Sequence, residues 1–268
     1  MKKILLLSLF LLLAFITKSQ DTTSKVLTHH LNDYEKSLMQ NYTRSFVETA
    51  PPTGSVRNIA EWEPVQSVII AYDSYNGFKV PTSLLKNLLT YTKITFLIEN
   101  VTEENSVKSI LTNAAANVNN AIFVYHDVDM WWTRDYSPWF IAIDNQEVAI
   151  VDFPYNRPRP NDDETPKIIG QNLGLTVYGM NLTHTGGNYM CDGMGKAAST
   201  RLILTENTSQ TEAQIDTKVQ NYLGIDTYFK FTDPLDDYIE HIDCWGKFLD
   251  VDKVLITQVP VSDHRYAD

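Results

Sequence analysis

The alternation of apolar and polar positions predicts short strands separated by helices. Residues 65–72, 94–98 and 121–125 are apolar runs rich in β-branched side chains, which are typical of buried strands. Between them, residues 83–91 and 103–117 carry apolar side chains at helical spacing. This β-α-β-α-β order favours strands that are covered by helices.

The second half of the chain continues with mixed elements. A hairpin is predicted from residues 138–143 and 147–153, joined across Asp144 and Asn145. The further predicted elements are a short helix at 167–173, a helix at 212–223 ended by Gly224, and strands at 176–180, 188–191, 200–205 and 254–259. Heptads, low-complexity tracts and sequence repeats are absent, so the pattern predicts an α/β or α+β domain.

The N-terminus has the pattern of a secretory signal peptide. Two lysines precede the apolar run 4–16, and a polar exit with small residues follows, so residues 1–19 are predicted to be removed. A membrane anchor is the alternative, but the run is short for a bilayer and no second long apolar stretch follows. We expect a secreted, periplasmic or cell-surface protein, with a leader at 20–61 and the main domain at 62–268.

Composition narrows the possible partners. The 268 residues carry a net charge of −11, which argues against binding to nucleic acid or anionic membranes and mildly favours cationic substrates. Two cysteines, Cys191 and Cys244, allow one disulfide but no disulfide-rich scaffold. Neither zinc-ligand spacing nor a cofactor-binding loop is present, so we expect no metal and no cofactor.

The first segment with candidate chemistry spans residues 131–139. It contains three tryptophans and Tyr136 around the charged pair Arg134 and Asp135. Indole faces attract cations and exclude water, which strengthens the attraction of a carboxylate for a cation. The segment is therefore a candidate guanidinium site, although a local Arg134–Asp135 ion pair in an aromatic core is an equal alternative.

A second segment, at residues 241–245, contains His241 and Asp243. In an extended backbone these two side chains point to the same face, which places an imidazole beside a carboxylate. Taken alone, the segment fits better with the alternative that Asp243 caps a helix over residues 245–249.

Two further segments are less specific. Residues 184–193 contain Gly186 and Gly187, which permit close approach of the backbone to a ligand but are equally common in tight hairpins. Arg157 and Arg159 lie on a proline-stiffened loop and can bind a carboxylate bidentately, although most exposed arginines are only solvated.

Taken in order, these segments resemble one family. The Trp-Thr-Arg-Asp-Tyr-x-Pro-Trp, Gly-Gly-Asn...Asp-Gly and His-Ile-Asp-Cys-Trp-x-Lys-Phe segments are similar to those of the porphyromonad-type peptidylarginine deiminases and their agmatine deiminase relatives, in the guanidino-modifying superfamily. The resemblance runs from about Trp62 to the last residue. It implies a pentein-type α/β propeller of pseudo-symmetric ββαβ units.

The resemblance also implies roles for individual residues. Asp135 and Asp243 would hold the substrate guanidinium, and His241 would be the general acid and base. The remaining implied roles are substrate binding by Trp132, Tyr238 and Asn188, and capture of the α-carboxylate of a C-terminal arginine by Arg157 and Arg159. Arginine-containing peptides or proteins are thus the expected partners, and citrulline and ammonia the expected products.

The chain departs from the family pattern in two places. The family nucleophile is a cysteine near the C-terminus, and the resemblance implies that it lies past Asp268, so we expect a C-terminally truncated propeller. Cys191 and Cys244 are expected to be buried bystanders. Thr185 stands where many relatives have a glutamate.

Three alternatives to a peptidylarginine deiminase remain open at this point. One is an agmatine deiminase of putrescine biosynthesis, although export places such an enzyme poorly. Another is an inactive module that binds arginine peptides through its acids and arginines. The last is an exported α/β protein without guanidino chemistry.

Overall fold

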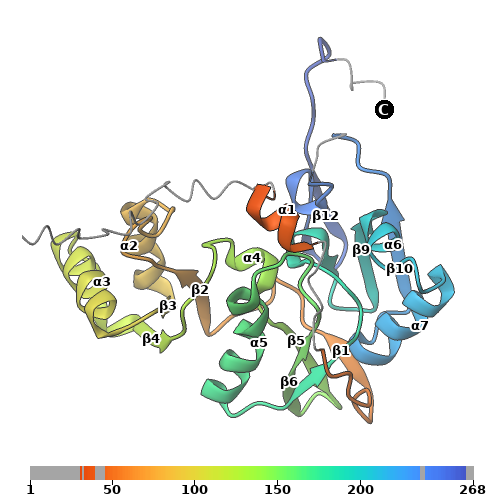
Figure 1. Cartoon of the computed structure of the whole chain (residues 1–268), viewed down its shortest axis with the longest axis horizontal. Coiled ribbons are helices and arrows are strands. Elements are labelled where there is room, and N and C mark those ends of the chain that lie inside the picture. Colours follow the sequence, from red (N-terminus) through yellow and green to blue (C-terminus); the bar gives the residue numbers. More distant parts are fainter. Residues whose placement is uncertain (1–30, 32, 40–45, 236–238, 264–268) are drawn as a thin grey trace, which may run out of the picture.

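The computed structural model describes residues 31, 33–39, 46–235 and 239–263. The predicted signal peptide and Tyr238 lie outside the described residues. Among the described helices, none combines the length and hydrophobicity that crossing a bilayer requires. A mixed α/β architecture is observed, as predicted, with four small sheets that stand beside one another instead of merging (Figure 1).

The first sheet confirms the predicted β-α-β-α-β order. Its strands are parallel in the order β2-β3-β4, with β3 buried in the middle. The elements of this unit are β2 (Ser67–Ala71), α2 (Thr82–Tyr91), β3 (Lys93–Ile98), α3 (Val101–Asn113), the 3-10 turn η1 (Val118–Asn120) and β4 (Ala121–Tyr125). Asn100 caps α3 by accepting from the backbone N–H groups of Thr102 and Glu103. The β-branched runs thus form strands, and the caps delimit the helices.

The second sheet has the order β1-β5-β6-β7 and contains the predicted hairpin. Its elements are β1 (Val56–Asn58), β5 (Trp139–Ile143), β6 (Glu147–Asp152), α5 (Pro160–Leu173) and β7 (Val177–Gly179). Asp144 and Asn145 have φ of 52° and 55°, as a type I′ turn requires. The predicted domain start near Trp62 is too late, because β1 pairs with β5 and belongs to the sheet.

The third sheet shows one wrong prediction. Its order is β10-β9-β8, and its elements are β8 (Met190–Cys191), β9 (Lys196–Thr200), α6 (Leu202–Glu206), α7 (Glu212–Leu223) and β10 (Thr227–Phe231). The predicted strand at 200–205 is instead the end of β9 followed by α6. The Thr200 hydroxyl accepts from Leu202 N–H at 3.3 Å and so begins the turn. Helix α7 ends as predicted at Gly224, whose φ is 67°.

The fourth sheet is an antiparallel hairpin, which excludes the helix considered for residues 245–249. Its strands are β11 (Gly246–Asp250) and β12 (Lys253–Ile256), preceded by the 3-10 turn η3 (Ile242–Cys244). Asp243 therefore lies in a short turn and caps no helix. The side chains of β12 are exposed along its whole length.

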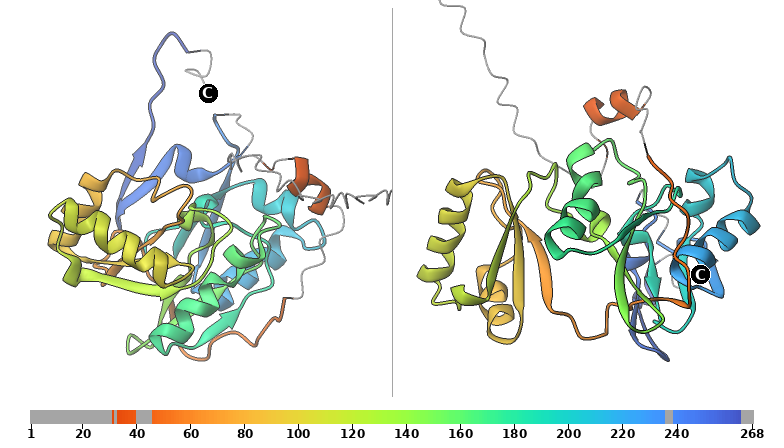
Figure 2. Two further views of the ribbon diagram at one scale, coloured as in Figure 1. Left: turned by 60° about the vertical axis from the view of Figure 1, so that its left-hand side comes forward. Right: turned by 90° about the horizontal axis from the view of Figure 1, so that it is seen from below.

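Buried side chains join the first three sheets in sequence. Leu97 and Val124 of the first sheet share a cluster with Ile150 of the second. A larger cluster joins the second sheet to the third and includes Val151 and Ile215. The sheets consequently follow one another across the molecule, and side chains of α5 and α7 belong to the clusters that join neighbouring sheets (Figures 1 and 2). Closure into a propeller stays a prediction.

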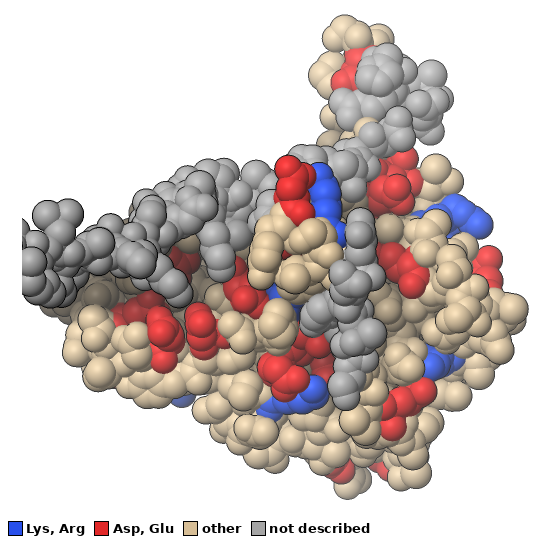
Figure 3. All heavy atoms as spheres, viewed as in Figure 1, with Lys and Arg blue, Asp and Glu red and all other residues tan. Residues whose placement is uncertain are grey.

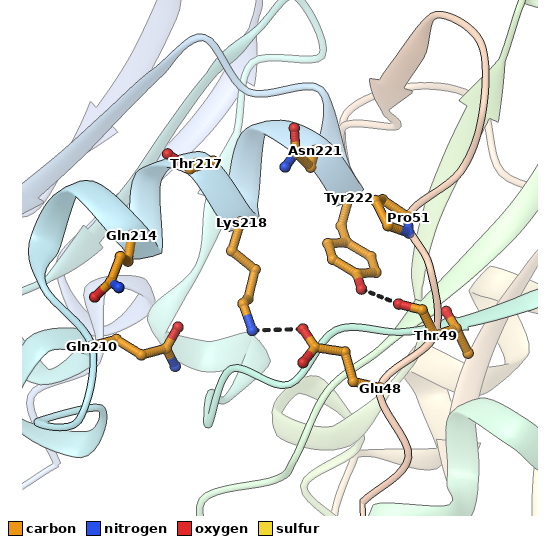
Figure 4. A pocket seen from close by; sticks show the side chains of 9 residues that line it. All are labelled: Glu48, Thr49, Pro51, Gln210, Gln214, Thr217, Lys218, Asn221 and Tyr222. Carbon is orange, nitrogen blue, oxygen red and sulfur yellow. Dashed lines mark hydrogen bonds and ion pairs between the residues drawn. The ribbon is translucent and has the colours of Figure 1, made fainter.

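A groove of about 580 Å³ lies where the segment before β1 passes α7 (Figure 4). Its lining is polar and is engaged within the protein, since Lys218 bonds to Glu48 at 2.6 Å and Tyr222 donates to the carbonyl of Thr49. These bonds hold the incoming chain against the third sheet. None of the candidate site residues described above is among the residues that line this groove.

Two adjacent leucines of α2 test the core of the first sheet. Leu85 is fully buried, whereas Leu84 is 45% exposed. Leu85→Ala is expected to lower the free energy of unfolding by about 2–5 kcal/mol through lost burial and a residual cavity. Leu84→Ala is the matched control, with an expected change below about 1 kcal/mol. Urea denaturation measures both, and equal losses would contradict the assigned packing.

Candidate active site

Three segments that are distant in sequence meet at one place. They are the short helix α4 (Thr133–Tyr136), the 3-10 turn η2 (Gly186–Asn188) and η3. At their meeting point Nδ1 of His241 lies 3.5 Å from Oδ1 of Asp135, and His241 is buried. The structure therefore brings together the predicted imidazole and the predicted carboxylate of the first segment.

Gly187 makes this approach possible. A Cβ atom at this position would lie 2.4 Å from Nδ1 of His241 and 2.5 Å from Oδ1 of Asp135. Gly186 is equally confined, because its Cβ would lie 2.1 Å from the carbonyl oxygen of Arg134. The paired glycines thus allow close packing between the segments, a role different from the ligand approach and the tight hairpin considered from the sequence.

A network of buried polar groups fixes the orientation of α4. The Tyr136 hydroxyl donates to the Met130 carbonyl at 2.5 Å, and Tyr136 is fully enclosed. Asp162 of α5 accepts from the backbone N–H groups of Asp129 and Met130 at 2.7 and 3.1 Å. Because α5 is itself packed on the second sheet, Asp135 is carried on a rigid support.

Burial dominates the electrostatics of Asp135. Desolvation raises the pKa of its carboxyl, while a hydrogen bond from Thr185 and the charges of Arg157, Arg159 and Arg134 oppose the rise. The two candidate carboxylate-binding arginines are therefore close enough to act on Asp135. Thr185, which is fully buried, supplies a neutral donor where a glutamate would add a third negative charge.

Asp243 faces the same site with a different partner. Burial raises the pKa of its carboxyl to about 6, against the attraction of Arg134, and the charge of Asp135 adds to the rise. Arg134 lies with Nε at 3.8 Å from Oδ2 of Asp243 and also forms an ion pair with Glu61. Glu61 in turn pairs with Lys247 of β11.

The local Arg134–Asp135 ion pair, which was the alternative for this segment, is not among the ion pairs of the described residues. Arg134 is turned toward Asp243 and Glu61, and Asp135 is left facing His241. Two acids from segments that are far apart in sequence converge, as the guanidinium hypothesis requires. The charge of Asp135 raises the pKa of Asp243, which places the two acids in one electrostatic environment.

Arg159 is buried at the start of α5, which corrects the picture of a solvated arginine. Its Nε donates to Oε1 of Glu35 at 2.7 Å and its Nη1 to the hydroxyl of Tyr155 at 3.4 Å. Arg157 contributes positive charge beside both Asp135 and Glu206. The two arginines thus border the site on the side of Asp135.

The remaining predicted residues occupy different positions. Asn188 is fully buried, and its side-chain oxygen accepts a hydrogen bond from the backbone N–H of Thr200 at 2.8 Å. This oxygen therefore links η2 to the end of β9. Trp132 precedes α4 and lies beside Trp131, with ring centroids 5.7 Å apart. Tyr238 is outside the described residues, and its role stays a prediction.

Both cysteines are free thiols and form no disulfide. Cys191 is buried, as predicted, and burial raises the pKa of its thiol to about 12, so it is not a thiolate at neutral pH. Cys244 is exposed, which corrects the prediction of burial for that residue. It follows Asp243 in η3 and contributes a side-chain hydrogen bond to that carboxylate.

Two acids beside the site escaped the sequence interpretation. Glu206 accepts from the side chain of Asn156 at 2.7 Å, and burial raises its pKa to about 7. Glu35, in the N-terminal helix α1 (Asp33–Met39), pairs with Arg159. A single glutamate on a helix belongs to no sequence motif, so its place beside the site can be recognised only from contacts between residues that are distant in sequence.

Comparison with known proteins agrees with this geometry. The protein family described as Porphyromonas-type peptidyl-arginine deiminase matches residues 57–268, and the chain belongs to this family. The match begins beside β1, in agreement with the observed start of the second sheet. The family acts on C–N bonds of guanidino groups, which disfavours the alternative of a protein without guanidino chemistry.

Solved structures share the fold at low sequence identity. A putative agmatine deiminase is similar at 18% identity with a TM-score of 0.72, over 83% of this chain and 68% of that one. The agmatine deiminase of Enterococcus faecalis is similar at 17% identity with a TM-score of 0.68, over 81% of this chain and 66% of that one. A putative arginine deiminase from Porphyromonas gingivalis is similar at 17% identity with a TM-score of 0.67, over 80% of this chain and 69% of that one. This chain thus spans about two thirds of each of these structures.

Gly187 offers a direct test of the site geometry. Gly187→Ala is expected to push His241 away from Asp135 and to cost about 1–3 kcal/mol of stability through overpacking. Gly246→Ala is the matched control, because a Cβ there meets its nearest atom at an ordinary 3.5 Å. Nitrogen NMR shifts of the His241 ring and urea denaturation report the two effects. Unchanged ring shifts in Gly187→Ala would contradict the assigned contact.

Proposed function

We propose that this chain carries the guanidinium-binding and acid–base part of a deiminase that converts peptidyl arginine, with the arginine at the C-terminus, to citrulline and ammonia. The observation that carries the proposal is the meeting of His241, Asp135 and Asp243, with His241 and Asp135 separated by 3.5 Å. An imidazole beside two acids is what the chemistry of a bound guanidinium needs.

The acids account for substrate binding. A guanidinium is planar and stays charged at any workable pH, so a site that removes it from water must offer carboxylates that match its N–H groups. Asp135 and Asp243 are both partly desolvated, which strengthens their attraction for such a cation. The bound cation favours their ionised forms in return.

The reaction requires a nucleophile and a proton carrier. In the first step of the proposed reaction, a cysteine thiolate attacks the guanidinium carbon and forms a C–S bond. His241 then protonates the departing nitrogen, which leaves as ammonia. His241 next takes a proton from water, which attacks the thiouronium carbon. The C–S bond breaks, the thiolate is restored and citrulline leaves.

The thiolate is assigned to neither cysteine of this sequence. Cys191 is buried beside the carbonyl of Ile59, at 3.8 Å, and its raised pKa leaves it protonated. Cys244 is exposed in η3, where its side chain forms a hydrogen bond with the carboxylate of Asp243. We place the nucleophile, as the family resemblance implies, in a cysteine past Asp268.

The preference for a peptide rests on the two arginines. Arg157 and Arg159 lie close enough to Asp135 for their charges to act on it, and we infer that they take the carboxylate end of a bound arginine. A free α-carboxylate fits them, whereas agmatine has none. Agmatine deiminase activity is the second candidate, favoured by the similarity to the solved agmatine deiminase from E. faecalis. An inactive arginine-peptide-binding module is the third.

The setting of the activity follows from charge and from the predicted signal peptide. Acidic side chains are spread over the face shown in Figure 3, with lysines and arginines at a few places between them. Such a surface attracts cationic peptides over nucleic acid. We propose that the protein acts outside the cytoplasm, on arginine-containing peptides or proteins, without a metal or cofactor.

The two arginines separate the peptide from the agmatine hypothesis. The double variant Arg157→Gln/Arg159→Gln is expected to weaken binding of a peptide ending in arginine about 10- to 100-fold, because hydrogen bonds to charged groups contribute about 1.5–3 kcal/mol. Its affinity for agmatine, which has no carboxylate, is expected not to fall. Calorimetry measures both, and the exposed Arg201→Gln is the control. Equal losses for both ligands would contradict the carboxylate role.

The raised pKa of Asp243 predicts a pH dependence of binding. Methylguanidinium stays charged, while Asp243 loses its charge as the pH falls through about 6. Affinity is therefore expected to be full near pH 8 and to fall by up to about tenfold per pH unit below 6, since one pKa unit corresponds to 1.36 kcal/mol. Asp243→Asn should bind weakly and lack this component. A flat profile in the wild type would contradict the assignment.

A further inference from the structure

Helix α1 is a small element on the outside of the fold, near the start of α5 (Figures 1 and 2). All seven of its residues are described, and Glu35 is the only buried one. Tyr34 and Met39 are exposed by 70% and 44%, and Leu38 is half-buried. The one buried side chain of the helix is therefore a carboxylate and not an apolar group.

The partner of Glu35 is a residue of the proposed substrate site. Oε1 of Glu35 accepts from Nε of Arg159 at 2.7 Å, and the two side chains are only 9% and 4% exposed. Nη2 of Arg159 is buried and has no hydrogen-bond partner among the described residues. Glu35 thus takes one donor of the guanidinium and leaves another available for a second oxygen.

The contact resembles what a substrate carboxylate would make. A carboxylate binds an arginine best through two parallel N–H···O bonds, and Glu35 occupies one of the positions from which such a pair is built. The charge, the chemical group and the burial are those expected for the α-carboxylate of a C-terminal arginine. The difference is that the carboxylate belongs to the chain itself.

The attachment is of a kind that a competitor can reverse. The mutual attraction of a buried ion pair is largely offset by the desolvation of its two members, so the pair holds the helix only modestly. Little apolar burial adds to it in α1. A ligand that brings its own carboxylate to Arg159 replaces the lost interaction while α1 returns to water.

We propose that Glu35 is an intramolecular ligand of Arg159, and that α1 competes with the carboxylate of the substrate for this guanidinium. The inference rests on the proposed function, because it takes Arg159 as the carboxylate-binding residue. Release of α1, by a ligand or by cleavage of the chain between α1 and β1, would then open the site to peptides that end in arginine.

Binding by Glu35 variants tests the competition. If α1 is docked in about 90% of molecules, its release raises the apparent affinity for a C-terminal arginine peptide about tenfold. Glu35→Gln, and Glu35→Lys as a second variant that also repels Arg159, are expected to show this gain by calorimetry. Asp33→Asn is the matched control, since it makes the same charge change at an exposed position of the same helix.

Agmatine separates the possible failures, because it lacks the carboxylate. Its affinity is expected to be the same in the wild type and in all three variants. Normal agmatine binding with unchanged peptide affinity in both Glu35 variants would overturn the competition alone. Weaker peptide binding in both would also overturn it and would make Glu35 a positioning residue for Arg159. Failure of every form to bind either ligand would overturn the proposed function, and the competition with it.

Hydrogen exchange provides a second readout on the unaltered chain. Addition of the arginine peptide is expected to speed amide exchange in residues 33–39, whereas agmatine leaves it unchanged. A slower exchange of α1 with the peptide would contradict displacement. Melting temperatures of the variants, measured alongside, show whether loss of the ion pair disturbs the rest of the fold.

Discussion

The whole arrangement depends on the cost of taking carboxylates out of water. Asp135 and Asp243 are held where burial raises the pKa of each, and each is supported by a basic group of the chain, His241 for the first and Arg134 for the second. His241 and Arg134 offset only part of the cost of burying the two acids, since the pKa of each carboxyl stays raised. The glycines of η2 allow the close approach of the segments that carry them.

Much of the fold follows from local sequence. The apolar runs of the first sheet, the hairpin turn at Asp144 and Asn145, and the end of α7 at Gly224 each have a short-range cause, and the sequence predicts them within a few residues. The errors occur where a short apolar run fits two structures. Residues 200–205 contain such a run, and its helix is fixed by the Thr200 hydroxyl and the strand that ends there.

The candidate site was less accessible from sequence. Periodicity cannot say that residues 135 and 241 are in contact, and the resemblance to a family supplied that pairing. The sequence also left open whether Arg134 pairs with the adjacent Asp135, and the fold instead turns its side chain toward Asp243 and Glu61. Glu35 and Glu206 gain their meaning only from burial, which no residue pattern at their positions announces.

Glu61 has a mechanical consequence. It forms ion pairs with Arg134 and with Lys247, which lies on the hairpin of the fourth sheet. Arg134 is itself paired with Asp243. A single side chain thus works as a coupling between this hairpin and the acid that faces the guanidinium position. A displacement of the hairpin, for example by contact with a neighbouring protein, therefore reaches Asp243 through three ion pairs, Lys247–Glu61, Glu61–Arg134 and Arg134–Asp243.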